Sequence, residues 1–261
     1  MIVRVLVVLL WSGVAQAQTP LLGTPDPRLD DPESTYALCL ETARAFPEQG
    51  LEFAGKWIGL AGGEPAKHCR AVALIGLDEF TEAASSLEDL ARASKRDPAV
   101  RAGMLAQAAQ AAMLGGDTDR AYADQTTALQ LLPNDPALLI DRAMTLAEAK
   151  NYWEAIDDLN VVLSAHPDNA EALAFRASAY RMVDADDLAL EDAERAVKDA
   201  PDNVNALLER GILYRLAGRN DDARRDWMKI LDRAPDSEAA RLARENIEKL
   251  DLKTESTAAP N

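Results

Sequence analysis

Small and apolar side chains recur along most of the chain with a period of about 34 residues. Two columns of this repeat hold tiny residues: Ala109, Ala143, Ala177 and Gly211 in the first, and Ala121, Ala155, Ala189 and Ala223 in the second. Larger apolar residues surround them at helical spacing, in one repeat as Leu139, Leu146, Leu159 and Leu163. This pattern predicts two amphipathic helices per repeat, whose backbones approach closely at the tiny residues.

The ends of these predicted helices carry the turn chemistry that such pairs require. Four prolines with the same spacing end the second helix of each pair: Pro133, Pro167, Pro201 and Pro235. The short motifs PND, PDN, PDN and PDS begin at these prolines and supply a turn and a helix cap. Between the two helices of a pair, turn signals lie at residues 115–117, 150–151 and 218–220.

With this period and these columns, the chain resembles the tetratricopeptide repeat proteins. The stretches RASAYRMVDADDLALEDAERAVKDAPDN and RGILYRLAGRNDDARRDWMKILDRAPDS carry the family's small, tyrosine, small, bulky and proline positions in order. The resemblance covers residues 102–237 well and implies an all-α fold, a right-handed α-solenoid of stacked helix pairs. Two positions depart from the family pattern, where leucine stands in place of tryptophan and arginine in place of leucine.

The pattern also divides the chain into segments. Residues 35–98 are predicted to form two divergent helix pairs, and residues 99–252 form four repeats followed by a C-terminal capping helix, which gives about six pairs. Residues 18–34 are rich in proline and are expected to be an extended linker. Residues 253–261 are expected to be a disordered tail.

Each of three repeats carries an arginine on its first helix and an aspartate 16 residues later: Arg142 and Asp158, Arg176 and Asp192, Arg210 and Asp226. One interpretation is a row of ligand-binding charges. We favour a repeated ion pair that fixes the two helices against each other, because both members recur together.

The N-terminal residues MIVRVLVVLLWSGVAQA have a lone Arg4, a short apolar stretch and a small-residue cleavage pattern. They predict a secretory signal peptide, residues 1–17, cleaved after Ala17; a retained membrane anchor is the alternative, although the apolar run is short for one. We therefore expect an exported, periplasmic protein with no membrane insertion after cleavage. A bacterial origin follows from the resemblance and from this signal layout.

Without Arg4 the mature chain carries 27 basic and 44 acidic side chains, a net charge of −17. Such a chain repels phosphate backbones, so a nucleic-acid partner is disfavoured. The acidity otherwise explains solubility and names no partner.

In tetratricopeptide relatives, the first helices line a concave groove that holds segments of other proteins. Carried onto this sequence, the resemblance assigns a markedly apolar groove with two arginines, a composition typical of an interface. The protein-binding residues it implies are Ile140, Met144, Phe175, Arg181, Leu208, Ile212 and Arg215. The alternative is that several of them merely pack against neighbouring helices or the C-terminal helix.

Catalytic motifs are lacking in the sequence, which shows no phosphate loop, no nucleophile elbow and no clustered metal ligands. We therefore expect no catalytic residue, no metal site and no cofactor. One alternative is a thiol-dependent enzyme or accessory subunit using Cys69, which follows His68 directly. Neighbouring residues on a helix point about 100° apart, however, so His68 is poorly placed to activate this thiol.

Cys39 and Cys69 are the only cysteines, and the repeat register puts them on the first helices of the first and second pairs. In an oxidising compartment, two cysteines on adjacent helices are candidates for a disulfide; two buried free thiols are the alternative. The function predicted from sequence is a non-catalytic scaffold or adaptor that binds a protein or peptide partner in the cell envelope. A periplasmic chaperone for exported chains is a further alternative.

Overall fold

The computed structural model describes the backbone of residues 31–258 and the side chains of residues 31–252. The predicted signal peptide and its cleavage site, the linker up to residue 30 and residues 259–261 lie outside this range. The first helix begins at Pro32, with Asp31 as its cap, so the last residues assigned to the linker are already helical.

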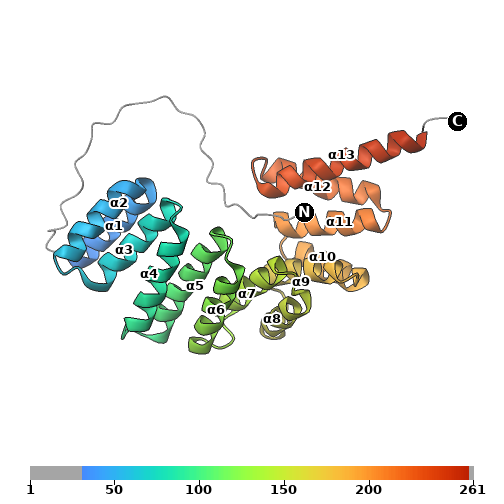
Figure 1. The fold of residues 1–261 in the computed structure, drawn as a ribbon. Coiled ribbons are helices and arrows are strands. Elements are labelled where there is room, and N and C mark those ends of the chain that lie inside the picture. Colours follow the sequence, from blue (N-terminus) through green and yellow to red (C-terminus); the bar gives the residue numbers. More distant parts are fainter. Residues whose placement is uncertain (1–30, 259–261) are drawn as a thin grey trace, which may run out of the picture. The chain divides into compact units, whose positions relative to one another are not determined.

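Residues 31–258 form thirteen α-helices (Figure 1), listed here with their bounds. They are α1 (Pro32–Ala45), α2 (Pro47–Gly59), α3 (Gly63–Gly76), α4 (Phe80–Ala93), α5 (Pro98–Leu114), α6 (Thr118–Leu131), α7 (Pro136–Glu148), α8 (Tyr152–Ala165), α9 (Ala170–Met182), α10 (Asp186–Asp199), α11 (Val204–Leu216), α12 (Asn220–Arg233) and α13 (Glu238–Ala258). Six consecutive pairs followed by one further helix match the prediction. The fold class, an all-α solenoid of helix pairs, is thereby confirmed.

The motifs that follow the repeat prolines act as helix caps. Asp135, Asn169, Asn203 and Ser237 hold the same position in successive repeats, and each side-chain oxygen accepts hydrogen bonds from backbone N–H groups of the helix that follows. These bonds are 2.9–3.1 Å long. They satisfy donors that have no partner within a helix, which explains why each first helix begins where it does.

The turns inside the pairs share one backbone feature, a residue in the left-handed region. Gly116, Lys150, Asp184 and Gly218 occupy it at the same position of successive repeats, with φ between 59° and 79°. A left-handed residue directly after a helix ends it and lets the chain reverse into the next one. The sequence signals at 115–117, 150–151 and 218–220 therefore mark the turns correctly.

The tiny residues of the two columns are buried. Within the units, Ala109 packs with Ala121 and Ala177 packs with Ala189 where paired helices meet. Gly211 shows why no larger side chain fits: a Cβ built on it would lie 2.4 Å from Nε1 of Trp227. Trp227 lies on the opposing helix α12 and is fully buried. The glycine and the tryptophan are therefore a matched pair, with the largest side chain of the interface facing the smallest.

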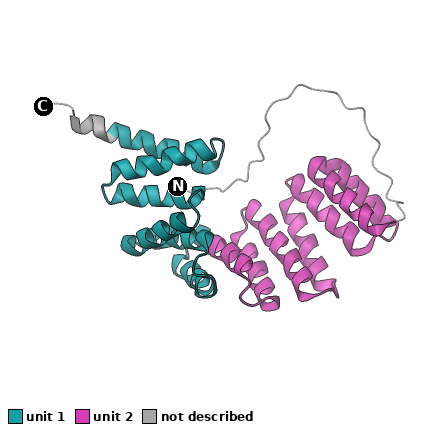
Figure 2. Cartoon of the chain, turned by 180° about the vertical axis from the view of Figure 1, so that it is seen from behind, with its two compact units in different colours: residues 1–14, 146–261 teal, residues 15–145 magenta. Residues whose placement is uncertain are grey.

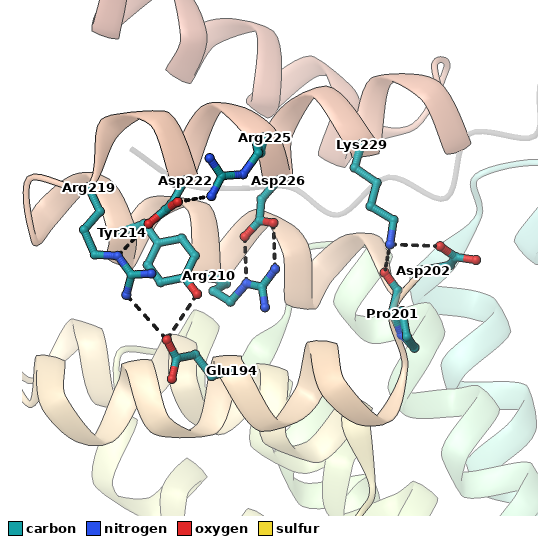
Figure 3. Close-up of polar contacts among 10 residues, drawn as sticks. All are labelled: Glu194, Pro201, Asp202, Arg210, Tyr214, Arg219, Asp222, Arg225, Asp226 and Lys229. Atoms are coloured by element: carbon teal, nitrogen blue, oxygen red, sulfur yellow. Dashed lines mark hydrogen bonds and ion pairs between the residues drawn. The ribbon is translucent and has the colours of Figure 1, made fainter.

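Buried ion pairs join the helices of the last two pairs, as predicted. Arg176 on α9 binds Asp192 on α10 through Nε and Nη2, at 2.6 and 2.8 Å. Arg210 on α11 binds Asp226 on α12 in the same two-pronged way, with both distances 2.7 Å (Figure 3). The structural interpretation of these arginines is confirmed for both pairs.

The described residues fall into two compact units (Figure 2), which we call the N-terminal unit, residues 31–145, and the C-terminal unit, residues 146–258. The division lies within α7. The third predicted ion pair has one member in each unit, Arg142 and Asp158, and stays a prediction. Each unit is described separately below.

In the N-terminal unit, Cys39 on α1 and Cys69 on α3 form the predicted disulfide, with their Cα atoms 6.1 Å apart. Both cysteines are fully buried in an apolar cluster with Phe53 and Trp57 of α2. The cross-link therefore joins two first helices at the centre of the most divergent part of the array.

In the C-terminal unit, α13 packs against α12 and α11, as expected of a capping helix. It continues to Ala258, well beyond the end that we assigned at Leu252, so the backbone of residues 253–258 is helical in the structure. None of the helices in the described part of the chain has the length and apolar character that a membrane span requires.

Candidate binding surface on the first helices

Five of the seven predicted binding residues lie together on two neighbouring helices of the C-terminal unit. Phe175 and Arg181 are on α9, and Leu208, Ile212 and Arg215 are on α11, which packs against α9. All five are partly exposed. We call this set, with the adjoining Met182 and Leu216, the first-helix surface.

The other two predicted residues, Ile140 and Met144, lie on α7 in the N-terminal unit. Met144 is partly exposed, but Ile140 is only 6% exposed and offers a partner almost no surface. Their part in binding stays a prediction, separate from the five residues on α9 and α11.

Two exposed apolar side chains extend the first-helix surface. Met182 ends α9 and Leu216 ends α11, in equivalent positions of successive repeats, and they are 46% and 51% exposed. With the partly exposed Leu208 and Ile212 they give α9 and α11 an apolar face that packing within the unit leaves uncovered. Uncovered apolar groups on adjacent helices are typical of an interface.

Arg181, predicted to contact a ligand, is instead held inside the surface by Glu209. Its Nε and Nη2 donate to the two carboxylate oxygens of Glu209 on α11, the second bond at 3.2 Å. Glu209 is buried. Burial alone would lower the pKa of Arg181, but the charge of Glu209 and its hydrogen bonds outweigh this effect and raise that pKa. The pair therefore joins α9 to α11 and leaves little of the arginine charge for a partner.

Arg215 occupies the same place one repeat later, but its counter-ion is missing. Ala243 on α13 stands one repeat after Glu209, where the carboxylate would be needed. Within the described residues no group accepts a hydrogen bond from the buried Nε of Arg215. The Nε of Arg215 is closed off from solvent, so a ligand reaches only the partly exposed remainder of this side chain. A guanidinium without a counter-ion gains most from a carboxylate or carbonyl supplied by a ligand.

The first helices of the N-terminal unit carry a different feature, a chain of hydrogen bonds across α1, α3 and α5. Tyr36 Oη lies 2.8 Å from Nδ1 of His68, and Nε2 of His68 lies 2.9 Å from Oε1 of Gln107. Because the amide oxygen accepts from Nε2–H, Nδ1 is left to accept from the tyrosine hydroxyl. His68 is therefore neutral and bridges three successive pairs.

The pKa shifts of this chain agree with that assignment. Burial lowers the pKa of His68, against the opposing effect of the Gln107 hydrogen bond, and the positive charge of Arg44 adds to the lowering. Burial likewise raises the pKa of Tyr36. Both groups stay uncharged at neutral pH, as a structural link between helices requires.

His68 and Cys69 point to different partners, so the dipeptide is not a catalytic pair. The Cys69 sulfur is bonded to Cys39, which leaves no thiolate for the alternative of a thiol-dependent enzyme. Over the described residues, no three His, Cys, Asp or Glu side chains converge in a way that could hold a metal ion.

Sequence reasoning overlooked the role of Glu209, which decides which arginine is available. The signal was present, because a glutamate lies 28 residues after Arg181 and an alanine lies 28 residues after Arg215. Comparing these two columns would have separated the paired arginine from the unpaired one.

Comparison with known proteins supports the repeat assignment. The model of the family Tetratricopeptide repeat matches residues 187–238, which run from α10 into α13. No curated protein sequence matches the chain significantly.

Several solved structures have a similar fold. MamA residues 41 to the end, from Desulfovibrio magneticus RS-1, is 24% identical over 67% of this chain and 97% of its own, with a TM-score of 0.55. YrrB, described as a TPR protein with an unusual peptide-binding site, is 20% identical over 67% of this chain and 87% of its own, with a TM-score of 0.54. A tetratricopeptide repeat protein from Parabacteroides merdae ATCC 43184 is 17% identical over 84% of this chain and 88% of its own, with a TM-score of 0.67. At these identities the likeness concerns the fold alone.

Proposed function

We propose that this tetratricopeptide repeat protein is a non-catalytic scaffold or adaptor that binds a segment of another protein on the first-helix surface of α9 and α11. The observation that carries the proposal is Arg215, whose counter-ion is replaced by Ala243 and whose buried Nε has no partner among the described residues. A ligand whose carboxylate pairs with the exposed part of this guanidinium can also cover the exposed side chains of Met182 and Leu216.

The composition of the surface defines the class of segment. Met182, Leu208, Ile212 and Leu216 suit apolar side chains, and Arg215 suits one carboxylate or backbone carbonyl. A short segment with apolar residues around a single acidic group fits this arrangement. The peptide-binding site described for YrrB supports binding of a peptide by this fold in general.

We place this function in the cell envelope, in the periplasm of a bacterium. The Cys39–Cys69 disulfide supports an oxidising compartment, because buried cross-links of this kind persist outside the reducing cytosol. The predicted signal peptide agrees with export but lies outside the described residues.

Crosslinking in cells, followed by mass spectrometry, tests the binding surface. The parent is compared with an Arg215→Gln/Leu216→Asp variant, which removes the free charge and makes an exposed apolar site acidic. We expect the recovery of bound partners to fall at least tenfold, because both changes remove favourable contacts of about 1–3 kcal/mol.

The matched control is Leu188→Asp on α10, a similarly exposed leucine, 49%, outside the surface. Circular dichroism checks that all variants fold. Recovery of the same partners in the same amounts from parent and double variant would refute the proposal. Recovery of many unrelated exported chains, lost together in the double variant, would assign the surface to a chaperone.

A further inference from the structure

The capping helix α13 keeps the repeat register of the first helices. Glu238 begins α13 one full repeat after Val204 begins α11, and Arg244 likewise lies one repeat after Arg210. In position, α13 is thus the first helix of a seventh pair. Its backbone runs on as one helix to Ala258, so within the described residues no second helix turns back over it.

The preceding pair shows where such a second helix lies. Figure 3 shows α12 held along α10 and α11 by polar contacts at three points. Arg210 pairs with Asp226, Arg219 lies 3.6 Å from Glu194 of α10, and Lys229 lies 3.2 Å from Asp202 after α10. The second helix of a pair, here α12, therefore lies over the seam between two other helices. These are α11, the first helix of the same pair, and α10, the second helix of the preceding pair.

The equivalent seam between α12 and α13 is an open groove of about 350 Å³. Its apolar lining consists of Met228, Leu231, Ile247 and Leu252, and its charged lining of Arg244, Glu248 and Asp251. Met228 and Leu252 are 53% and 60% exposed. One repeat earlier, Val197 and Leu213 hold the places of Leu231 and Ile247 and are buried.

Two substitutions distinguish this seam from the one before it. Met228 stands one repeat after Glu194, which binds Tyr214 and Arg219 in the covered seam. The acid of the covered seam is thus lost from the second helix, while Glu248 on α13 stands one repeat after Tyr214 and lines the groove. The four apolar lining residues suit a helix with an apolar face.

Arg244 indicates that a helix bound in this groove should carry a negatively charged side chain. Its equivalents Arg176 and Arg210 each bind an aspartate 16 residues later, but the residue 16 after Arg244 is Pro260. No carboxylate of residues 31–252 pairs with Arg244, whose Nη2 donates to the carbonyl oxygen of Pro235 at 2.5 Å. Among residues 31–252 no carboxylate completes the pattern, and an occupant of the groove can supply one.

Glu245 distinguishes this site from a simple continuation of the array. It stands where the earlier first helices carry alanine or glycine, and Arg241 binds it. A covering helix cannot approach α13 as closely as α12 approaches α11 at Gly211. The occupant therefore lies on the α12 side of Glu245, over Met228 and Ile247.

We propose that the groove between α12 and α13 binds an amphipathic helix of a partner protein, with an apolar stripe on Met228, Leu231 and Ile247 and an aspartate or glutamate paired with Arg244. This site is separate from the first-helix surface on α9 and α11. The groove gives the protein a second interface with a partner. In this interface the partner's helix takes the place of the second helix of the seventh pair.

A stapled helical peptide with the sequence of residues 184–200 serves as the probe, because it carries Asp192 in the spacing that pairs with an arginine of this column. Fluorescence anisotropy measures its binding to the full-length chain. We expect the parent to bind it, Arg244→Gln to weaken binding at least tenfold, and Ile247→Asp to abolish it. The matched control Arg241→Gln changes an exposed arginine outside the groove and leaves binding within twofold of the parent.

A second peptide with Asp192→Asn tests the ion pair itself. It should bind the parent as weakly as the first peptide binds Arg244→Gln, with no further loss when both changes are combined. The Leu216→Asp variant should bind the first peptide like the parent, which keeps this test independent of the first-helix surface.

Three results would overturn the proposal. The first is that the peptide does not bind the parent, and the second is that it binds the parent and the Ile247→Asp variant equally well. The third is that analytical ultracentrifugation shows the parent as a dimer and the Ile247→Asp variant as a monomer. The last result would assign the groove to a second copy of the chain.

Discussion

The C-terminal unit joins the helices of its pairs by buried arginine–aspartate pairs, whereas the N-terminal unit joins its first helices by a disulfide and by the hydrogen bonds of His68. The contrast is clearest at one position of the repeat, which holds an aspartate on the second helix of each pair from α6 to α12. Asp192 and Asp226 each bind an arginine with two hydrogen bonds. Asp124 on α6 has the same place in its repeat, but Ala108 stands where the arginine would be.

Asp124 is therefore buried without its usual counter-ion. One of its oxygens, Oδ2, has no hydrogen-bond partner among the described residues. Burial, with the nearby charge of Glu88 and a hydrogen bond to it, raises the pKa of Asp124 to about 7; Arg120 opposes the rise but is itself bound to Glu88.

The comparison shows that a repeat position does not determine the chemistry of its side chain. With an arginine opposite, the aspartate forms a permanent ion pair. Without one, it becomes a group that titrates near neutral pH. Three changes test this difference, beginning with the largest expected effect.

Replacing Arg176 with leucine leaves the buried Asp192 with only a 3.6 Å contact to the partly exposed Arg195. We expect a loss of about 3–5 kcal/mol in the free energy of unfolding of the C-terminal unit, because removing one member of a buried ion pair is strongly destabilising. Amide hydrogen exchange should show reduced protection in α9 and α10 and unchanged protection in α1–α3. The double variant Arg176→Leu/Asp192→Leu should recover most of the stability. If single and double variants both unfold like the parent, the ion pair contributes nothing.

Replacing both cysteines with alanine should destabilise the N-terminal unit by about 3 kcal/mol, since the disulfide closes a loop of about 30 residues in the unfolded chain. Hydrogen exchange should here report the loss in α1–α3 and not in α9–α12. The reduced parent is the matched control and should behave like the double variant. Alkylation of both cysteines without prior reduction would contradict the cross-link.

Asp124→Asn should produce the smallest change, visible through pH. Folding raises the pKa of Asp124 from its ordinary 3.8 to about 7, so the folded parent binds this proton more tightly and loses stability as pH rises between these values. Asparagine carries no titrating proton. The variant should therefore gain about 1–2 kcal/mol over the parent at pH 8.5 and little at pH 4.

Urea unfolding across this pH range measures the effect. The control Asp119→Asn changes an exposed aspartate on the same helix and should follow the parent. Parallel pH profiles for the parent and Asp124→Asn would show that Asp124 has an ordinary pKa.

The helix pairs could be predicted from sequence because their determinants are local and repeated. Tiny residues, caps and left-handed turns each recur once per repeat, so one correct register gives all of them. The continuation of α13 to Ala258 was missed because residues 253–258 carry none of the small or apolar columns.

The candidate site was only half predictable, because the availability of a side chain depends on its neighbours. Arg181 and Arg215 are equivalent by register, and only the residue on the next helix, Glu209 or Ala243, separates them. His68 was likewise regarded as a neighbour of the disulfide. Its partners, 32 and 39 residues away in the sequence, come together only through the packing of three successive first helices.

The ring that Cys39 and Cys69 close has a topological consequence. It encloses the whole of α2 and both turns that flank it. A protease that cuts either turn therefore opens the ring without separating the two fragments, since the sulfur bridge still joins them. The N-terminal end of the array can then survive a nick as a two-chain form, separable only after reduction.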